Sequence, residues 1–310
     1  MVDLVTTGYL TLDDLVLADG RVVRDTLGGG ALYAAVGALV WGSAVGLHAC
    51  AGGDYPVHLL QQIAAAGIDL RGVTDGPPHS LRLWLLEEAE RRKQQLPKLA
   101  SPSVAALDAD RGPLPEAYAA AAGFHVAPSL PETQRGIAAE IRRRAPGAVI
   151  TVDIWTESFF DPTPYSDPSF LADIDAFLPS DKEVEALWGL DDLAATLRRL
   201  AAAGPHVVAV KRGGLGSLIY DRGRDVFWEI PAVPVRPIDT IGAGDAYCGG
   251  FLTGMVETGD ALEAGLRGTI SASFAIQDYG ALAGIDPDPA EVTRRLTALR
   301  GRVRCGDPDS

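Results

Sequence analysis

The sequence predicts an α/β fold with a mostly parallel central sheet. Short apolar segments alternate with Ala- and Leu-rich helical segments along most of the 310 residues, which is the pattern of a doubly wound sheet with helices on its faces. Residues 27–53 contain no Asp, Glu, Lys or Arg, as is typical of strands that a parallel sheet buries on both faces. Such sheets bind ligands beyond the carboxyl ends of their strands.

The elements follow from local patterns in chain order. Apolar runs predict strands at residues 2–8, 44–50, 123–127, 148–153, 174–178 and 207–211, and a hairpin over 217–229. Periodicity and composition predict helices at 31–41, 57–66, 132–144, 182–187, 191–203, 246–256, 260–278 and 289–299. Because glycines interrupt residues 27–53, this segment is predicted to be a buried helix and a strand rather than a membrane span.

Two segments interrupt the alternation. Residues 10–26 have the pattern of an antiparallel hairpin with Asp19-Gly20 at its turn, and residues 80–107 contain an apolar run, a charged run and several prolines. Together they are expected to form a small β lid over the functional site. The sequence has no internal repeat, low-complexity tract or interdomain linker, so residues 1–310 are expected to form a single domain.

Composition limits the classes of function. The chain has 27 basic and 41 acidic residues, a formal net charge of −14, which disfavours nucleic acid and membrane surfaces as partners because they attract clustered Lys or Arg. Its three cysteines, Cys50, Cys248 and Cys305, are widely spaced and odd in number, which argues against a disulfide framework and favours a cytoplasmic location. The opening residues lack the basic region of a secretory signal.

The most informative segment is residues 239–250, which read Asp-Thr-Ile-Gly-Ala-Gly-Asp-Ala-Tyr-Cys-Gly-Gly. Small residues leave the backbone bare, so several N–H groups can converge on an anion at the start of the predicted helix. Asp245 stands at this helix start, where its carboxylate can accept a proton from an attacking alcohol. The alternative is a turn that only caps the helix, but such a turn needs one or two glycines and no flanking aspartates.

The segment 239–245 resembles the most specific motif of the ribokinase/PfkB family of carbohydrate and nucleoside kinases. The resemblance implies a ribokinase-like three-layer α/β/α sandwich with a mostly parallel central sheet and a small β lid. It also implies that Asp245 is the catalytic base and that the amides of Gly242, Ala243 and Gly244 form an anion hole. Further matches, in the family's order, extend along most of the chain.

The run Gly28-Gly29-Gly30 before the first buried helix is similar to the family's amino-terminal glycine motif. Gly28 and Gly29 take the positions that let the backbone approach a sugar, so the resemblance implies that they bind substrate. Tyr33 stands where many members have Asn and is included among the substrate-binding candidates. A close-packed loop before a buried helix is the structural alternative.

Two aspartates are further substrate-binding candidates by resemblance. Asp13 matches a residue at the end of the first strand that accepts hydrogen bonds from substrate hydroxyls, and a carboxylate can bridge two such hydroxyls. The adjacent Asp14 is the alternative contact. Asp153 takes the place of a family Asp at the end of a central strand, but it is followed by Ile154-Trp155 where Pro-Asn is usual.

The second half of the chain provides the nucleotide-binding candidates. The segment 210–216, Val-Lys-Arg-Gly-Gly-Leu-Gly, follows a predicted strand and resembles the family's nucleotide-edge loop, and residues 271–275 resemble the helix beside the adenine. The resemblance therefore implies nucleotide contacts from Lys211, Gly213, Gly216, Thr240 and Ala275. By itself the glycine-rich segment is also compatible with an ordinary turn.

The metal candidates are Glu183, Asp239 and Ile241. Residues 179–183, Pro-Ser-Asp-Lys-Glu, align with the family's Asn-x-x-Glu element, with Ser180 in place of Asn. The resemblance implies that Glu183 organises Mg²⁺ through water, and Mg²⁺ commonly uses few carboxylates. The alternative is a helix cap with acidic residues in the first turn. Asp239 and the Ile241 carbonyl stand where many relatives bind a monovalent cation, K⁺.

These matches predict an ATP- and Mg²⁺-dependent kinase that phosphorylates a hydroxyl of a small-molecule sugar or nucleoside. A homodimer through the lid is a further expectation from the resemblance. The alternative is a non-catalytic ribokinase-like ligand-binding or scaffold protein, which the substitutions at Tyr33, Ser180 and Trp155 keep open. The sequence lacks both the dinucleotide fingerprint of a Rossmann dehydrogenase and the phosphate loop of a P-loop kinase.

Overall fold

The computed structural model describes residues 1–87, 93–156 and 161–306. Its centre is a large sheet of strands in the order β14 (Arg304–Cys305), β13 (Val226–Ile230), β12 (Ser217–Asp221), β11 (Val207–Lys211), β10 (Ala176–Phe177), β9 (Val149–Val152), β8 (Gly123–Val126), β1 (Leu4–Tyr9), β4 (Val45–Ala51) and β5 (Asp69–Asp75). Pairs from β11 to β5 are parallel, and pairs from β11 to β14 are antiparallel. The predicted α/β fold with a mostly parallel sheet is thereby confirmed.

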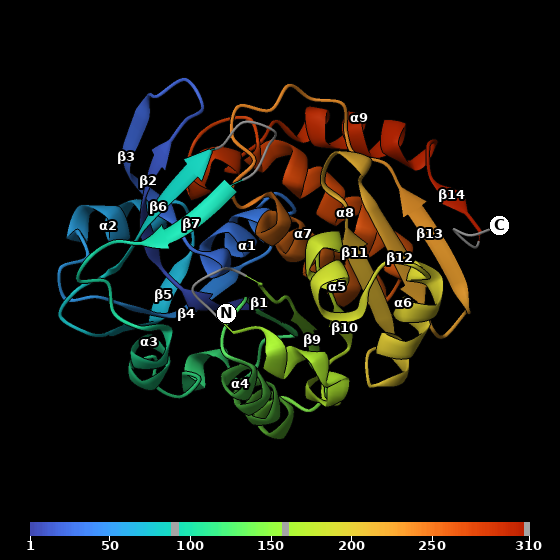
Figure 1. The fold of residues 1–310 in the computed structure, drawn as a ribbon, viewed down its shortest axis with the longest axis horizontal. Coiled ribbons are helices and arrows are strands. Elements are labelled where there is room, and N and C mark those ends of the chain that lie inside the picture. The colour runs from blue at the N-terminus through green and yellow to red at the C-terminus, as the bar shows by residue number, and fades with distance from the viewer. Residues whose placement is uncertain (88–92, 157–160, 307–310) are drawn as a thin grey trace.

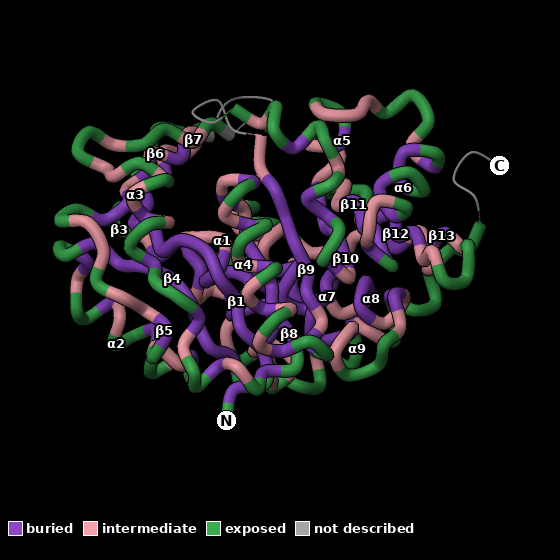
Figure 2. Tube along the Cα trace, turned by 90° about the horizontal axis from the view of Figure 1, so that it is seen from below, coloured by how far each residue is buried: buried purple, intermediate pink, exposed green. Residues whose placement is uncertain are grey.

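Helices cover both faces of this sheet (Figure 1). One layer contains α1 (Gly30–Leu39), α7 (Ala243–Thr258), α8 (Ala261–Ala275) and α9 (Pro289–Arg300), and α2 (Val57–Ala65) packs into the same core as α1. The other layer contains α4 (Pro131–Arg144), α5 (Asp181–Trp188) and α6 (Leu193–Ala202). Figure 2 shows the strands between them as a buried centre.

The two cores follow from the alternation of side chains along each strand. In β11, Val208 and Val210 belong to the core beneath α4, α5 and α6, whereas Val207 and Ala209 belong to the core beneath α7, α8 and α9. Because both sets are buried, the strand is apolar at every one of these positions, which is the reason its sequence shows an uninterrupted apolar run.

A second, smaller sheet lies beside the end of the large sheet that holds β4 and β5 (Figure 1). Its strand order is β3 (Val22–Gly28), β2 (Thr11–Val16), β6 (Leu81–Glu87) and β7 (Lys93–Pro97). The strands come from the two segments predicted as a lid, although residues 88–92 of that prediction lie outside the described residues. The alternating Leu81, Leu83 and Leu85 are buried together with Leu107 of α3 (Val104–Asp110), so one face of β6 joins this sheet to the body of the molecule.

The structure adds elements that the sequence patterns did not predict. Strand β5 pairs in parallel with β4 at the sheet edge, but its sequence, Asp-Leu-Arg-Gly-Val-Thr-Asp, has no apolar run because an edge strand is covered incompletely. The helix α3 lies where only an irregular, proline-containing stretch was expected. None of the helices in the described parts of the chain is long and apolar enough to cross a membrane.

Candidate active site

The amino end of α7 presents bare backbone beside the carboxyl ends of β9 and β11. Gly242 is the N-cap residue, has a φ of 68° and offers no side chain to cap the helix. A Cβ atom at this position would lie 2.2 Å from Cδ1 of Tyr33. Both the left-handed backbone and the contact with the Tyr33 ring therefore require glycine at residue 242. The amides of Ala243 and Gly244 follow in the first turn, where helix amides and the dipole favour an anion.

Asp245 lies in the first turn of α7 and faces the start of α1. A Cβ atom on Gly30 would lie 2.5 Å from Oδ1 of Asp245, so the carboxylate packs directly against the Gly30 backbone. Burial, and then the charge of Asp153, raises the pKa of Asp245 to about 7, although Lys211 lowers it. A carboxyl group with a pKa near neutrality is suited to general acid–base chemistry.

Lys211 brings a positive charge to the same place. It is the last residue of β11, and its Nζ forms a buried ion pair with Asp153, the residue that follows β9. Nζ also lies 3.3 Å from the position of a Cβ atom on Gly244 and 3.7 Å from Cys248 Sγ. Burial is the largest single influence on the pKa of Lys211 and lowers it, but the charges of Asp153, Glu183 and Asp245 together outweigh burial and raise the pKa. The ammonium therefore stays charged beside the start of α7.

Glu183 occupies the first turn of α5. Its Oε2 accepts a hydrogen bond of 2.5 Å from the Ser180 amide, and its own amide donates to Ser180 Oγ at 3.4 Å, which completes a capping box. The helix cap that the sequence offered as the alternative interpretation of these residues is therefore present in the structure. Burial, and then the charge of Asp153, raises the pKa of Glu183 to about 8, so a cation nearby would favour its ionised form.

The structure distinguishes Asp13 from Asp14. Asp14 is paired with Lys98 at 2.8 Å and with Arg24 at 3.3 Å. Asp13 is only 3% exposed, accepts a hydrogen bond of 3.0 Å from Thr11 Oγ1 on Oδ2, and its Oδ1 has no partner among the described residues. Burial raises the pKa of Asp13 to about 7. Asp13 therefore has acceptor capacity left for a ligand, whereas Asp14 is held in ion pairs.

Gly28 and Gly29 lie beside Asp13 and the end of β1. A Cβ atom on Gly28 would lie 1.9 Å from Asp13 Oδ2, and one on Gly29, which has a φ of 105°, would lie 2.1 Å from the Tyr9 carbonyl oxygen. Both glycines are thus needed for close approach of β3 to β2 and β1. The two glycine motifs of the sequence meet through Gly30 and Asp245, more than two hundred residues apart.

The remaining candidates lie around the start of α7. Gly213 and Gly216 have φ values of 54° and 92° in the turn that follows Lys211. The amides of Ile238 and Asp239 donate to the Ile276 carbonyl at 2.8 and 3.4 Å, so the end of α8, with the buried Ala275, adjoins this loop.

Two neighbouring candidates shape the loop itself. Asp239 is buried, and its Oδ1 accepts a hydrogen bond of 3.0 Å from the Ile241 amide. Thr240 is exposed, and its carbonyl accepts from the Ala243 amide at 3.4 Å. These contacts fix the loop locally, and the nucleotide and K⁺ roles of its residues stay predictions.

Sequence reasoning missed three features of the site. Gly30 was visible only as the third glycine of a run, and nothing in the sequence indicated that it faces Asp245. Tyr55, just after β4, is 5% exposed, and its hydroxyl has no hydrogen-bond partner among the described residues. Trp155 stacks on Tyr9, with ring centroids 6.0 Å apart and planes 23° apart. Each depends on contacts between distant segments.

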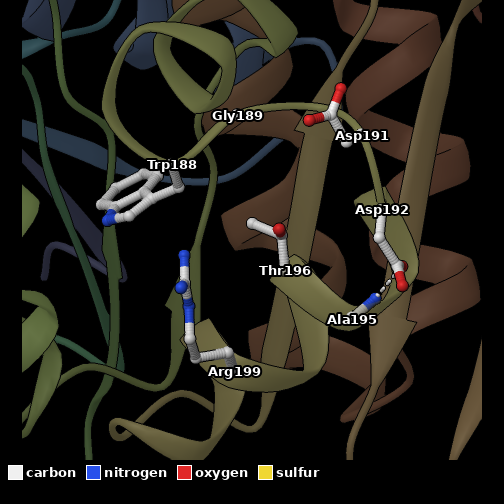
Figure 3. Close-up of a pocket in the computed structure, with 7 residues that line it drawn as sticks. All are labelled: Trp188, Gly189, Asp191, Asp192, Ala195, Thr196 and Arg199. Atoms are coloured by element: carbon white, nitrogen blue, oxygen red, sulfur yellow. Dashed lines mark hydrogen bonds between the residues drawn. The ribbon is translucent and has the colours of Figure 1, made fainter.

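A surface hollow elsewhere in the molecule contains none of these residues. It has a volume of about 270 Å³ and lies between the end of α5 and α6 (Figure 3). Trp188, Thr196 and Arg199 line it together with the N-cap residue Asp192, whose carboxylate accepts from the Ala195 amide at 2.7 Å. None of the residues singled out from the sequence lines this hollow.

A model of the pfkB family of carbohydrate kinases matches residues 2–288 of the chain. The chain belongs to this family. Among curated relatives, a cytidine kinase of Thermococcus kodakarensis is 30% identical over 268 residues, which cover 82% of this chain and 88% of that protein. A 2-dehydro-3-deoxygluconokinase of Dickeya dadantii is 36% identical over 129 residues, which cover 41% of each chain. The predicted kinase class is thereby confirmed for this pfkB-family protein.

Solved structures confirm the ribokinase-like fold of this pfkB-family chain. The nucleoside kinase of Burkholderia thailandensis in complex with ADP-inosine has a TM-score of 0.74 at 18% identity and covers 96% of each chain. The ribokinase of Arabidopsis thaliana complexed with ribose and ATP has a TM-score of 0.72 at 18% identity, and the match covers 96% of this chain and 99% of that one. At such identities the likeness establishes the fold.

The residues of the site fit a phosphate group and a magnesium ion. The uncapped amides of the α7 start and the Lys211 ammonium are donors that suit phosphate oxygens. Within the described residues there is no group of three or more His, Cys, Asp or Glu side chains that could hold a metal ion. A Mg²⁺ ion would therefore depend on phosphate oxygens and water in addition to Glu183, as Mg²⁺ commonly does.

Proposed function

We propose that the protein transfers the γ-phosphoryl group of ATP to a hydroxyl of a sugar or nucleoside, with Asp245 as the general base. The observation that carries this proposal is the meeting of the Asp245 carboxylate, the bare amides of the α7 start and the Lys211 ammonium at one place. A solved Escherichia coli chain with a TM-score of 0.75 to this one was determined with ATP and Mg²⁺, which supports the same donor and metal here.

The reaction follows from these positions. The acceptor hydroxyl, bound near Asp13, gives its proton to Asp245 while its oxygen attacks the γ-phosphorus. The bond from the γ-phosphorus to the bridging oxygen of the β-phosphate breaks, and ADP leaves. The amides of Gly242, Ala243 and Gly244 and the charge of Lys211 stabilise the negative charge on the transferred group. Bound Mg²⁺, near Glu183, would neutralise phosphate charge. Because the transition state of phosphoryl transfer is loose, a carboxylate with a pKa of about 7 is basic enough.

The class of acceptor molecule is less closely defined than the catalytic groups are. Relatives of this chain are named cytidine kinase, nucleoside kinase and 2-dehydro-3-deoxygluconokinase, so their acceptors include nucleosides and a sugar acid. The proposed contacts to the acceptor are those of Asp13, Gly28 and Gly29. The proposed lid is the small sheet, whose strands β2 and β3 carry Asp13 and Gly28, and the proposed dimer would form through its outer surface.

The decisive experiment is the variant Asp245→Asn. We expect kcat to fall about 10²–10⁴-fold, the usual contribution of a general base, while the dissociation constant for Mg²⁺-ATP measured by calorimetry stays within a few-fold. Asp192→Asn is the matched control, since it changes an aspartate at a helix cap in the hollow of Figure 3 to another good cap residue. Normal turnover by Asp245→Asn would exclude Asp245 as the base, and ligand binding by the native protein without ADP formation would favour a scaffold.

A further inference from the structure

We propose that the acceptor of this kinase is a nucleoside, bound with its ribose hydroxyls at Asp13 and Tyr55 and its base against the Tyr9–Trp155 stack. The inference rests on the proposed function and names the acceptor class of the same site. It is carried by two buried polar atoms that have no partner among the described residues and by a stacked aromatic pair.

The hydroxyl-binding side consists of Asp13 Oδ1 and the Tyr55 hydroxyl. Both side chains are almost completely buried, at 3% and 5% exposure, and neither atom has a hydrogen-bond partner among the described residues. Buried polar atoms are nearly always paired, so these two atoms are available to pair with a ligand that enters the site. A carboxylate accepts and a phenol can donate, and a substrate hydroxyl can do both at once.

Strand pairing brings these two residues to the same edge of the molecule. Strands β1 and β4 are parallel neighbours with Tyr9 opposite Cys50. Asp13 lies four residues beyond the end of β1, and Tyr55 lies four residues beyond the end of β4. The charge of Asp13 acts on the Tyr55 hydroxyl, since after burial it is the next cause that raises the pKa of Tyr55. Tyr55 is thus a hydroxyl-binding candidate beside Asp13.

The base-binding side is the stacked pair of Tyr9 and Trp155. The Tyr9 hydroxyl donates to Asp108 at 2.8 Å and lies 2.9 Å from Ser129 Oγ, and Asp108 is held in turn by Arg111 at 2.9 Å. These contacts fix the Tyr9 ring. Trp155, two residues after Asp153, stacks on this ring and remains partly exposed. A flat base can stack on such a surface with the whole of its π face.

The neighbouring surface is apolar. Tyr9 belongs to a buried cluster that includes Leu15 and the inward leucines of β6, and Trp155 and Ile241 pack against this cluster. An apolar wall leaves the hydroxyls of a sugar unpaired but accommodates one edge of a base. The acceptor site therefore has a polar part and an aromatic, apolar part, as a nucleoside has.

The charges disfavour a sugar acid. Three basic side chains that reach residues of the site are already paired with aspartates: Lys98 with Asp14 at 2.8 Å, Arg111 with Asp108 at 2.9 Å, and Lys211 with Asp153. An acceptor carboxylate would have to compete with these aspartates, and it would approach Asp13 as well. A neutral acceptor avoids that repulsion.

The test measures ADP formation with Mg²⁺-ATP and a panel of acceptors. The panel contains cytidine, uridine, adenosine, inosine and guanosine, their 2′- and 3′-deoxy forms, and ribose, fructose and 2-dehydro-3-deoxygluconate. We expect at least one nucleoside to exceed every free sugar and the sugar acid in kcat/KM by 100-fold or more. ADP formation with a sugar but with no nucleoside overturns this inference and leaves the kinase function intact. No ADP with any acceptor overturns the kinase function and, with it, the inference.

Trp155 variants test the contact with the base. Trp155→Leu should lower kcat/KM for the preferred nucleoside about 10–100-fold, mainly through KM, as the loss of one base–aromatic stack does. Trp155→Phe should keep most of the activity because it retains an aromatic face. Trp188→Leu, in the hollow of Figure 3, is the matched control and should change kcat/KM less than twofold. Full activity of Trp155→Leu, or equal losses in the Phe and Leu variants, overturns the stacking contact.

Tyr55→Phe tests the hydroxyl contact. The native protein should prefer the ribonucleoside to its 2′- or 3′-deoxy form, and Tyr55→Phe should reduce that preference at least tenfold while activity on the deoxy form stays within threefold. A variant that lost packing alone would lower both activities together. Unchanged discrimination in Tyr55→Phe overturns the role of its hydroxyl.

Discussion

Replacing Gly30 by alanine should inactivate the enzyme without unfolding it. The new methyl group would lie 2.5 Å from Asp245 Oδ1, whereas ordinary contacts of a Cβ atom begin at about 3.4 Å. The carboxylate is the end of a flexible side chain, so it should recede by roughly 1 Å while the backbone stays in place. A displacement of about 1 Å at a reacting group can lower the rate about 10²-fold, and we expect that loss in kcat with KM within threefold.

The free energy of unfolding of Gly30→Ala should rise slightly or stay unchanged. Gly30 is the first residue of α1 and its φ is not positive, so alanine fits the backbone and lowers the entropy of the unfolded chain, worth about 0.4–1 kcal/mol. Steady-state kinetics and thermal melts of the same samples measure both effects. Gly136→Ala is the control: Gly136 is an exposed residue of α4 with no atom within 4 Å of an added Cβ, so its kcat should be unchanged. A Gly30→Ala enzyme with native kcat, or one that loses activity only because it unfolds, would refute the reasoning.

Three further predictions concern the charged groups. As the proposed general base, Asp245 must be deprotonated to accept a proton, and its pKa is raised to about 7. The ratio kcat/KM should therefore rise with pH up to about 7 and then level off; a profile already flat from pH 5 would contradict this. Lys211→Met should lower the free energy of unfolding by about 3 kcal/mol because Asp153 is left buried and unpaired, and adding Asp153→Asn should recover at least half of that in urea unfolding. The pKa of Asp13 is raised from 3.8 to about 7, so stability present below pH 4 is lost as pH rises through 7. Asp13→Asn should therefore be more stable than the native protein at pH 8, by about 4 kcal/mol at most. Equal stability at that pH would count against the buried, unpaired carboxylate.

The parts of the site that lie within one segment were predictable from sequence. The bare backbone of residues 242–244 and the helix that starts there could be predicted because small residues and a helix start act locally, and the structure begins α7 at Ala243. The anion-binding role of these residues stays a prediction. The large sheet was predictable for a related reason, since strands buried on both faces must be apolar throughout. The hairpin with Asp19-Gly20 at its turn was likewise predictable from turn chemistry, and β2 and β3 pair antiparallel as expected.

The parts that depend on contacts between segments were not predictable in this way. No local pattern indicates that Gly30 faces Asp245, that Lys211 pairs with Asp153, or that Trp155 stacks on Tyr9. Strand β5 was missed for another reason: at the edge of the sheet only part of it is buried, so its sequence lacks the apolar run that identified the central strands.

The distribution of acidic groups argues that the site was shaped for chemistry rather than for stability. Asp13, Glu183 and Asp245 have pKa values raised to about 7 or 8 by burial, and each would destabilise the folded protein when ionised. These three carboxylates come from different elements, β2, α5 and α7, so the formation of one element does not account for all of them. The buried ammonium of Lys211 is already paired with Asp153. Ion-pair networks that serve stability place opposite charges together, whereas Asp13, Glu183 and Asp245 are an excess of carboxylates without an ion-pair partner among the described residues. Such an excess is favourable only when further positive charge and hydrogen-bond donors arrive, which a magnesium ion and an acceptor with hydroxyl groups would provide.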